Sequence, residues 1–187
     1  MMKLAVASIL ALLVAAPQSP LAVRDLDGRA WTPLAPAAGE INLVFFLSID
    51  CPISARYSPE INRIVHDYAP KNVHAWLVYV DPSAKIDAVR SNLKDFHAGI
   101  QAPAVIDAGL RLTIAANATV TPEAFVYTHA GRAYRGRIDD LYDAIGVNRR
   151  SAGRHDLREA LDAVLAGKPA PAPDTKPVGC FIERDIK

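Results

Sequence analysis

The feature that most constrains the fold is the segment 41–48 (INLVFFLS), which is almost unbroken in apolar side chains. A strand with one face in water alternates apolar and polar residues, so a continuous apolar run predicts a strand that is covered on both faces. Such a strand lies in the middle of a sheet, with other elements packed on either side of it. We therefore expect an α/β domain with a central mixed sheet flanked by helices.

The other predicted elements alternate in the same way along the chain. Apolar runs indicate strands, and apolar side chains at helical spacing indicate helices, the first of which is kinked at Pro59. Turn signals around Asp27-Gly28 and around 129–132 predict two antiparallel hairpins, one of them N-terminal. The predicted strands are 41–48, 73–80, 104–106, 123–128 and 133–138, and the predicted helices are 52–69, 84–97, 110–116 and 157–165, the last capped by Asp156.

The first residues have the pattern of an export signal. Lys3 supplies a positive charge, residues 4–14 form an apolar stretch, and small residues follow at Ala15 and Ala16. The apolar stretch is too short to span a bilayer comfortably, and the alternatives are an uncleaved anchor or a buried N-terminal strand. We expect a signal peptide within 1–19, no stable membrane insertion after its removal, and a bacterial protein that is periplasmic or secreted.

The composition excludes several classes of protein. With 51% hydrophobic residues, 22% charged residues and two cysteines, the chain is not disordered, collagen-like or disulfide-dense. Its 21 Lys and Arg residues balance 20 Asp and Glu residues without a long basic run, so we expect no nucleic-acid partner. A metal site of Cys51, Cys180 and His129 can be drawn, but the five histidines are scattered, and we expect no metal and no cofactor.

The chemistry concentrates at Cys51. This residue follows the predicted strand 41–48 and directly precedes Pro52, which suits the first position of a helix. Its sulfur should lie among free backbone amides at the positive end of the helix, and this placement lowers the pKa of a thiol. Ser54 can donate its hydroxyl to the sulfur, and Arg56 is close in sequence. The pattern predicts a reactive cysteine, and the alternative is a buried and inert one.

Three segments together resemble the thioredoxin superfamily, in particular its exported redoxin branch of peroxiredoxin-like and thiol:disulfide-interchange proteins. They are 43–54 (LVFFLSIDCPIS), 120–125 (VTPEAF) and 134–139 (YRGRID), and the resemblance covers roughly residues 21–165. It implies a thioredoxin-like fold with Cys51 as the nucleophile at the start of the first long helix. It also implies that Ser54 holds the second cysteine position of a C-x-x-C motif and that Thr121-Pro122 forms a cis-proline loop facing Cys51.

The sequence departs from both subfamilies of that branch. Because Ser54 replaces the second cysteine of the dithiol oxidoreductases, a disulfide within the motif cannot form. Ser48 supplies the hydroxyl of the peroxiredoxin pattern Ser-x-x-Cys, but Val44 stands where that pattern has a proline. Neither subfamily assignment transfers cleanly to this chain.

Cys180 lies in a proline-rich tail, 168–187, after the domain 20–167. About twelve extended residues reach on the order of 35 Å, enough to return from the last helix to Cys51. Three interpretations of Cys180 stay open. It is a resolving thiol for Cys51, a permanent structural bridge to Cys51, or a free thiol that docks the tail or meets another protein.

The function expected is thiol–disulfide exchange with a protein or small-molecule thiol or disulfide, with Cys51, Ser54, Thr121, Pro122 and Cys180 in the catalytic site. The first alternative is a thiol peroxidase, in which Ser48 and an arginine polarise the O–O bond of a peroxide. The second is a non-enzymatic scaffold with a structural Cys51–Cys180 disulfide. The residues expected to meet the substrate are Pro52, Ser48 and Arg56, and Arg137 is a further arginine that could approach Cys51.

Overall fold

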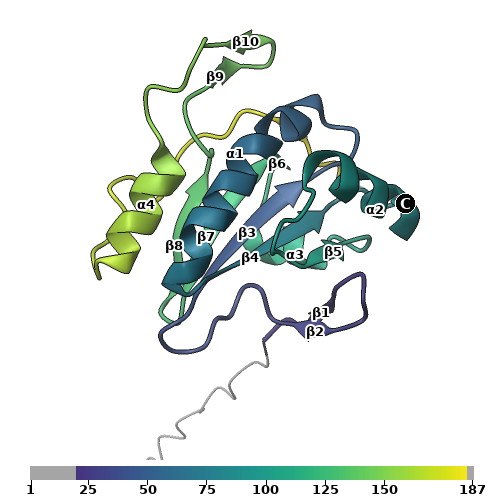
Figure 1. The fold of residues 1–187 in the computed structure, drawn as a ribbon, viewed down its shortest axis with the longest axis horizontal. Coiled ribbons are helices and arrows are strands. Elements are labelled where there is room, and N and C mark those ends of the chain that lie inside the picture. The colour runs from purple at the N-terminus through teal and green to yellow at the C-terminus, as the bar shows by residue number, and fades with distance from the viewer. Residues whose placement is uncertain (1–19, 185–187) are drawn as a thin grey trace, which may run out of the picture.

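The computed structural model describes residues 20–184, so the expected signal peptide lies outside the described residues. A five-stranded mixed sheet in the order β5-β4-β3-β7-β8 forms its centre (Figure 1). β3 is parallel to β4 and antiparallel to β7, β4 is parallel to β5, and β7 is antiparallel to β8. The strands are β3 (Ile41–Leu47), β4 (Val73–Tyr79), β5 (Ala104–Ile106), β7 (Glu123–Thr128) and β8 (Gly131–Gly136).

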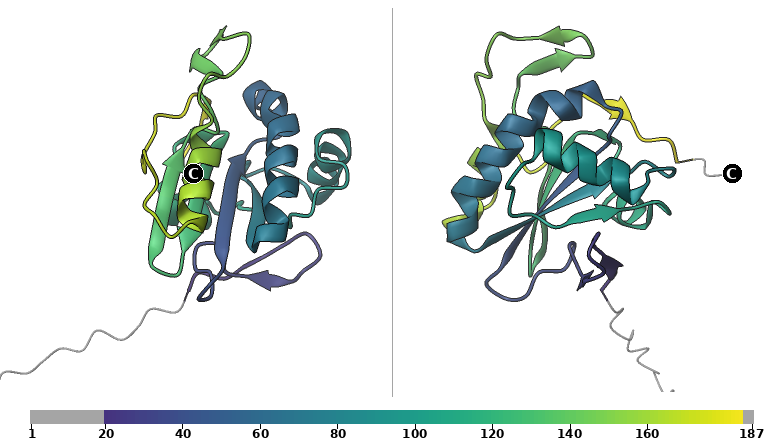
Figure 2. Two further views of the ribbon diagram at one scale, coloured as in Figure 1. Left: turned by 60° about the vertical axis from the view of Figure 1, so that its left-hand side comes forward. Right: turned by 45° about the vertical axis from the view of Figure 1, so that its right-hand side comes forward.

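The central strand is β3, and all seven of its residues are buried, as the apolar run predicts. Leu43 and Phe45 pack on one side with helices α1, α2 and α4, whereas Val44 and Phe46 pack on the other with α3 and the N-terminal hairpin. The views in Figure 2 show these two layers. The helices are α1 (Pro52–Tyr68), α2 (Ile86–Phe96), α3 (Arg111–Ala116) and α4 (Asp156–Leu165), with a short 3-10 turn at Ala69–Lys71.

The predicted helices are present, with ends that differ by one or two residues. Helix α1 continues through Pro59 to Tyr68. The prediction that Asp156 caps the last helix is wrong, because His155 holds the cap position without a side-chain hydrogen bond. Asp156 is the first helical residue and is buried, and it accepts a hydrogen bond from Nε of Arg137 at 2.8 Å. The Asp156 carboxylate is therefore bound in an ion pair with Arg137 and does not cap the N-terminus of its own helix.

Both predicted hairpins are confirmed. The N-terminal one pairs β1 (Val23–Arg24) with β2 (Ala30–Trp31), and the second pairs β7 with β8. β8 begins at Gly131 rather than at residue 133, since the turn between the strands is shorter than expected and Gly131 has a positive φ of 119°.

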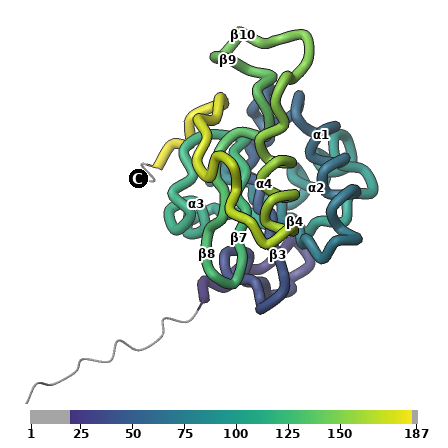
Figure 3. Tube along the Cα trace, turned by 90° about the vertical axis from the view of Figure 1, so that its left-hand side faces the viewer, coloured from purple at the N-terminus to yellow at the C-terminus, as the bar shows by residue number. Residues whose placement is uncertain are grey.

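Two further strand pairs have no signal in the sequence. A small hairpin pairs β9 (Tyr142–Ala144) with β10 (Val147–Asn148). The second pair joins β6 (Val120–Thr121), just before β7, to β11 (Cys180–Phe181) in the tail. Figure 3 shows the tail leaving α4, passing along β8 and turning back toward the other end of the sheet. Within residues 20–184, none of the helices is both long and apolar enough to cross a membrane.

Candidate active site

Cys51 holds the position before the first turn of α1. Its backbone is extended, with φ of −89° and ψ of 110°, and its Sγ accepts a hydrogen bond from the backbone amide of Ser54 at 3.4 Å. The side chain is 2% exposed. The strand β3 and the helix α1 thus place one sulfur atom at the positive end of a helix of 17 residues.

The peptide bond between Thr121 and Pro122 is cis, as the family resemblance implies. Thr121 is buried, and its carbonyl oxygen accepts a hydrogen bond from Sγ of Cys51 at 3.0 Å. The loop before β7 therefore faces the start of α1, and it brings Thr121 and Cys51 together although 70 positions separate them.

The tail brings the second cysteine to the same place. Cys180 lies opposite Thr121 in the β11–β6 pair, and its Sγ is 2.6 Å from Sγ of Cys51. Both are free cysteines in the structure. The structure thus places Cys180 beside Cys51, as a resolving thiol or a structural bridge requires.

The two thiols differ in acidity. Burial raises the pKa of the Cys51 thiol, but hydrogen bonds to its sulfur, of which that from Cys180 is the largest, outweigh burial and lower the pKa below its ordinary value. Burial and the neighbouring Cys51 sulfur raise the pKa of Cys180 to about 11. The two pKa values are therefore displaced in opposite directions, and Cys51 is the first of the pair to lose its proton as the pH rises.

Ser54 contacts the sulfur mainly through its backbone. Its amide makes the hydrogen bond to Cys51, whereas its buried Oγ has no partner at hydrogen-bonding geometry, although the nearby hydroxyl is among the groups that lower the pKa of the Cys51 thiol. The first-turn amides of a helix point along its axis toward the residue before it, whereas a side chain of that turn points outward from the axis. The backbone therefore reaches the sulfur better than the hydroxyl does.

Ser48 orders the loop between β3 and α1. Its Oγ donates to Oδ1 of Asp81 at 2.5 Å and accepts from the amide of Asp50 at 3.2 Å. The other carboxylate oxygen of Asp81 accepts from the amide of Ile49 at 3.0 Å. Asp81 follows β4, and its role was missed in the sequence because only the parallel pairing of β3 with β4 places it beside this loop.

The remaining predicted residues do not all converge on the sulfur atoms. Pro52 and Arg56 are exposed, and Arg56 borders a separate hollow with Tyr57 and Asp139. Arg137 is engaged in the ion pair with Asp156. Ser48, Thr121 and Cys180 share one pocket of about 470 Å³, which also includes three carboxylate side chains. Those side chains are Asp50, Asp81 and Glu183.

A buried carboxylate stabilises the cis-proline loop. Glu123 directly follows Pro122 and has no exposed surface, and its Oε2 accepts from the amide and hydroxyl of Thr119 at 2.7 and 3.2 Å. Its Oε1 lies 3.6 Å from Nε of Arg135, which is also 3.7 Å from a carboxylate oxygen of Asp174 in the tail. Charged side chains thus connect this loop with the tail.

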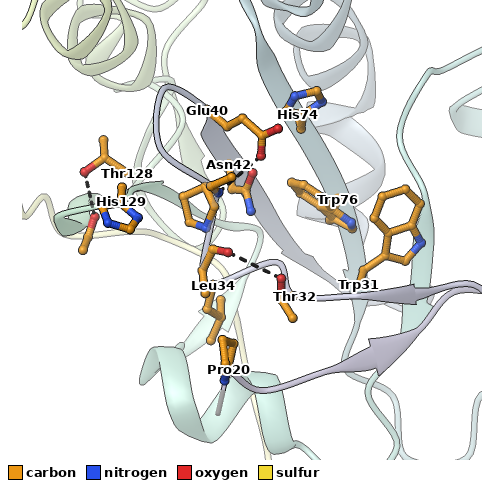
Figure 4. Close-up of a pocket in the computed structure, with 14 residues that line it drawn as sticks. Pro20, Trp31, Thr32, Leu34, Glu40, Asn42, His74, Trp76, Thr128 and His129 are labelled. Carbon is orange, nitrogen blue, oxygen red and sulfur yellow. Dashed lines mark hydrogen bonds between the residues drawn. The ribbon is translucent and has the colours of Figure 1, made fainter. Parts of the chain in front are cut away.

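A second pocket, of about 570 Å³, lies at the amino ends of β3 and β4, away from the cysteines (Figure 4). Trp31 and Trp76 form one side of it, with ring centroids 6.0 Å apart, and Glu40, Asn42 and His129 are also at its wall. Asn42 and Trp76 line this pocket, and Oδ1 of Asn42 and Nε1 of Trp76 are buried without a hydrogen-bond partner. Among residues 20–184, no group of three or more His, Cys, Asp or Glu side chains is arranged to hold a metal ion.

Solved structures of other proteins that resemble this chain show which fold it has. A hypothetical protein from Sinorhizobium meliloti is 25% identical, with a TM-score of 0.74 and coverage of 90% of this chain and 93% of that one. An uncharacterized conserved protein from Geobacillus kaustophilus is 22% identical, with a TM-score of 0.76 and 90% of each chain covered. A putative thiol:disulfide interchange protein DsbE from Chlorobium tepidum is 15% identical, with a TM-score of 0.59 and coverage of 79% and 94%.

No protein-family model matches the sequence, and no curated protein matches it. The structural matches nevertheless settle the architecture, because they include thioredoxin-like proteins and thiol:disulfide interchange proteins over most of their length. The chain has the thioredoxin-like fold, with a five-stranded mixed sheet and flanking helices, as the sequence predicts.

Proposed function

We propose that this protein is an exported thiol–disulfide oxidoreductase in which Cys51 is the nucleophile and Cys180 the second sulfur. One observation carries the proposal. The Cys51 sulfur lies at the N-terminus of α1, receives a backbone hydrogen bond there, and is 2.6 Å from the Cys180 sulfur. A thiolate stabilised in this way attacks disulfides, and a second thiol within reach completes the exchange.

The reaction has two steps. The Cys51 thiolate attacks one sulfur of a substrate disulfide, so that a mixed disulfide forms and the other substrate sulfur leaves as a thiolate. Cys180 then loses its proton and attacks Sγ of Cys51, and the first substrate sulfur leaves as a thiolate that takes up a proton. The substrate gains two electrons, and the protein is left with a Cys51–Cys180 disulfide. The reverse sequence oxidises a substrate dithiol.

The acidities of the two cysteines fit this order of events. The hydrogen bonds that lower the pKa of Cys51 make it the first nucleophile. The neighbouring Cys51 sulfur is one of the causes that raise the pKa of Cys180. In the mixed disulfide Cys51 carries no charge, so this cause is removed, and Cys180 becomes more acidic at the step in which it must attack.

The surroundings of the sulfur atoms favour disulfide exchange over peroxide reduction. A thiol peroxidase needs a donor to polarise the O–O bond, and Ser48 and Arg137 are the expected donors. The hydroxyl of Ser48 donates to Asp81, and the guanidinium of Arg137 is bonded to Asp156. The hydroxyl hydrogen of Ser48 and two of the three guanidinium nitrogens of Arg137 are therefore already used in bonds to carboxylates.

The proposal is tested by the turnover of a peptide disulfide with dithiothreitol as electron donor. Cys51→Ser is expected to abolish the activity, while Cys180→Ser is expected to accumulate a mixed disulfide on Cys51 that mass spectrometry detects. Peroxide consumption that is lost in Cys51→Ser and retained in Cys180→Ser would identify a one-cysteine peroxidase instead. If Cys51 of the reduced protein fails to react with any disulfide, the scaffold alternative is correct.

Two features support the expectation that this exchange takes place outside the cytoplasm. The leader 1–19 has the pattern of an export signal, and one of the matched structures is a secreted Mycobacterium tuberculosis disulfide oxidoreductase, 15% identical with a TM-score of 0.54. An exported location is tested by fractionating cells that produce the full chain, with mass spectrometry of the mature N-terminus. An intact leader on cytoplasmic protein would contradict it.

A further inference from the structure

The tail is attached to the domain through backbone hydrogen bonds as well as through side chains such as Asp174 and Thr175. The amide of Arg135 donates to the carbonyl of Pro173 at 2.9 Å, and the amide of Thr175 donates to the carbonyl of Arg135 at 3.0 Å. Further along, the amide of Ile182 donates to the carbonyl of Thr119 at 3.1 Å. The side chain of Phe181 is 81% exposed, so its burial contributes little to holding the strand β11 in place.

Two glycines allow the backbones to approach this closely. A Cβ atom at Gly136 in β8 would overlap the carbonyl oxygen of Thr175, and a Cβ atom at Gly179 in the tail would overlap the carbonyl oxygen of Thr121. One glycine belongs to the domain and the other to the tail. Because every other residue would force the two backbones apart, the docked position of the tail depends on both glycines.

The docked tail occupies the approach to the nucleophile. Cys51 is 2% exposed, and its sulfur contacts Sγ of Cys180 at 2.6 Å and the carbonyl of Thr121 at 3.0 Å. The edge of β6 is already paired with β11. An extended polypeptide that pairs with this edge would need the same backbone groups that β11 now uses.

We propose that β11 is a resident strand that closes the Cys51 site against polypeptide substrates, and that Gly179 determines how firmly it closes. This inference rests on the proposed function and adds a step to it. The tail leaves the edge of β6 so that the Cys51 thiolate can attack a protein disulfide. The tail then returns so that Cys180 can attack Sγ of Cys51 and release the substrate as a thiol.

The variant that tests the proposal is Gly179→Ala, made in the full-length chain that carries Cys180→Ser, so that no second thiol competes for the reagent. Gly109→Ala is the matched control. Neither glycine has a positive φ, but a Cβ atom at Gly109 meets only Cγ of Arg111, at an ordinary 3.8 Å. Any difference between the variants therefore comes from the contact with Thr121.

Two disulfides that release the same coloured leaving group, 5-thio-2-nitrobenzoate, serve as probes. One is a mixed disulfide with 2-mercaptoethanol, and the other is a mixed disulfide with a ten-residue peptide. For Gly179→Ala we expect the ratio of the peptide rate to the small-molecule rate to rise by at least about tenfold, a change equivalent to 1.4 kcal/mol. For Gly109→Ala we expect no change. An unchanged ratio in Gly179→Ala would overturn the proposal even if Cys51 reacts rapidly with both probes.

Amide hydrogen exchange separates failure of this proposal from failure of the proposed function, because it needs no reaction at sulfur. In Gly179→Ala the amide of Ile182 is expected to exchange at least about tenfold faster, again the equivalent of 1.4 kcal/mol. The amide of Val80, which bonds to Leu47 in the core, is the internal reference and should not change. If the Ile182 amide keeps its protection, the tail is not held through Gly179, whatever the chemistry of Cys51.

Discussion

Thr121 and Cys180 lie opposite each other in an antiparallel strand pair, and the carbonyl of Thr121 also accepts a hydrogen bond from Sγ of Cys51. This one residue therefore contacts both sulfur-bearing segments. Thr121 thereby lies next to the cysteine at the start of the first long helix and also next to the cysteine in the tail.

The alkylation of Cys51 in the reduced protein should depend on a lowered pKa. The rate is expected to rise with pH through a midpoint below about 8.5, the ordinary value for a free cysteine. Because the hydrogen bond from Cys180 is the largest of the favourable causes, Cys180→Ala should move the midpoint upward, and Cys180→Ser, which keeps an O–H donor, should move it less. Iodoacetamide alkylation followed by mass spectrometry measures each midpoint. A wild-type midpoint at or above 8.5 would contradict the assignment of Cys51 as a thiolate nucleophile.

Oxidation of the cysteine pair should stabilise the fold. A Cys51–Cys180 disulfide closes a loop of well over a hundred residues, which contributes about 4 to 5 kcal/mol in the chain-entropy description. Urea denaturation of the oxidised and the reduced protein should differ by an amount of this size, and the difference should vanish in Cys180→Ser. Peptide mapping without reductant identifies the bond. A map without this linkage after mild oxidation would argue against a paired role for Cys180.

Asp81 should matter to the site although it does not touch either sulfur. Asp81→Ala removes both acceptors that hold Ser48 and Ile49, and we expect a loss of about 1 to 3 kcal/mol in stability and slower alkylation of Cys51. The control is Asp50→Ala, because that carboxylate is exposed and borders the same pocket. Equal effects of the two substitutions would show that only the negative charge of the pocket matters.

His97 should make the fold sensitive to mild acid. It is 3% exposed, and burial lowers its pKa to about 4, while Nδ1 lies 2.7 Å from Oδ1 of Asn62. The unfolded chain therefore binds a proton near pH 6.5, before the folded chain does. The stabilisation is complete above that pH and is lost as the pH falls, by about 3 kcal/mol at pH 4.

The His97 effect is measured as the difference in unfolding free energy between pH 7 and pH 4. His97→Gln should remove this component of the pH dependence. His66→Gln is the control, since the His66 side chain is 89% exposed. A pH dependence that stays the same in His97→Gln would place the acid sensitivity in the carboxylates instead.

Much of the architecture could be predicted because it is encoded in local patterns. The buried run in β3 and the spacing of apolar residues in α1 each appear within a short window, and so does the placement of Cys51 between them. The cis-proline loop at Thr121 followed from a family resemblance rather than from the physics of the residues themselves.

The missed features depend on contacts between distant segments. Asp81 contacts the Ser48 loop only because β3 and β4 are parallel neighbours. Asp156 was expected to cap its own helix, but the fold places Arg137 within 2.8 Å of it. The two-residue strands β6 and β11 are too short to show any periodicity.

The amino-acid sequence alone is enough to predict the buried central strand and the cysteine at the start of the following helix. Both features are visible in the type and spacing of residues within a short window, so they can be predicted without knowledge of the fold. The contact between Cys180 and Cys51, by contrast, follows from the folded chain and not from any local pattern. A proline-rich tail can reach many points on the surface, and its final position depends on backbone contacts at Gly136 and Gly179 that exist only once the sheet has formed.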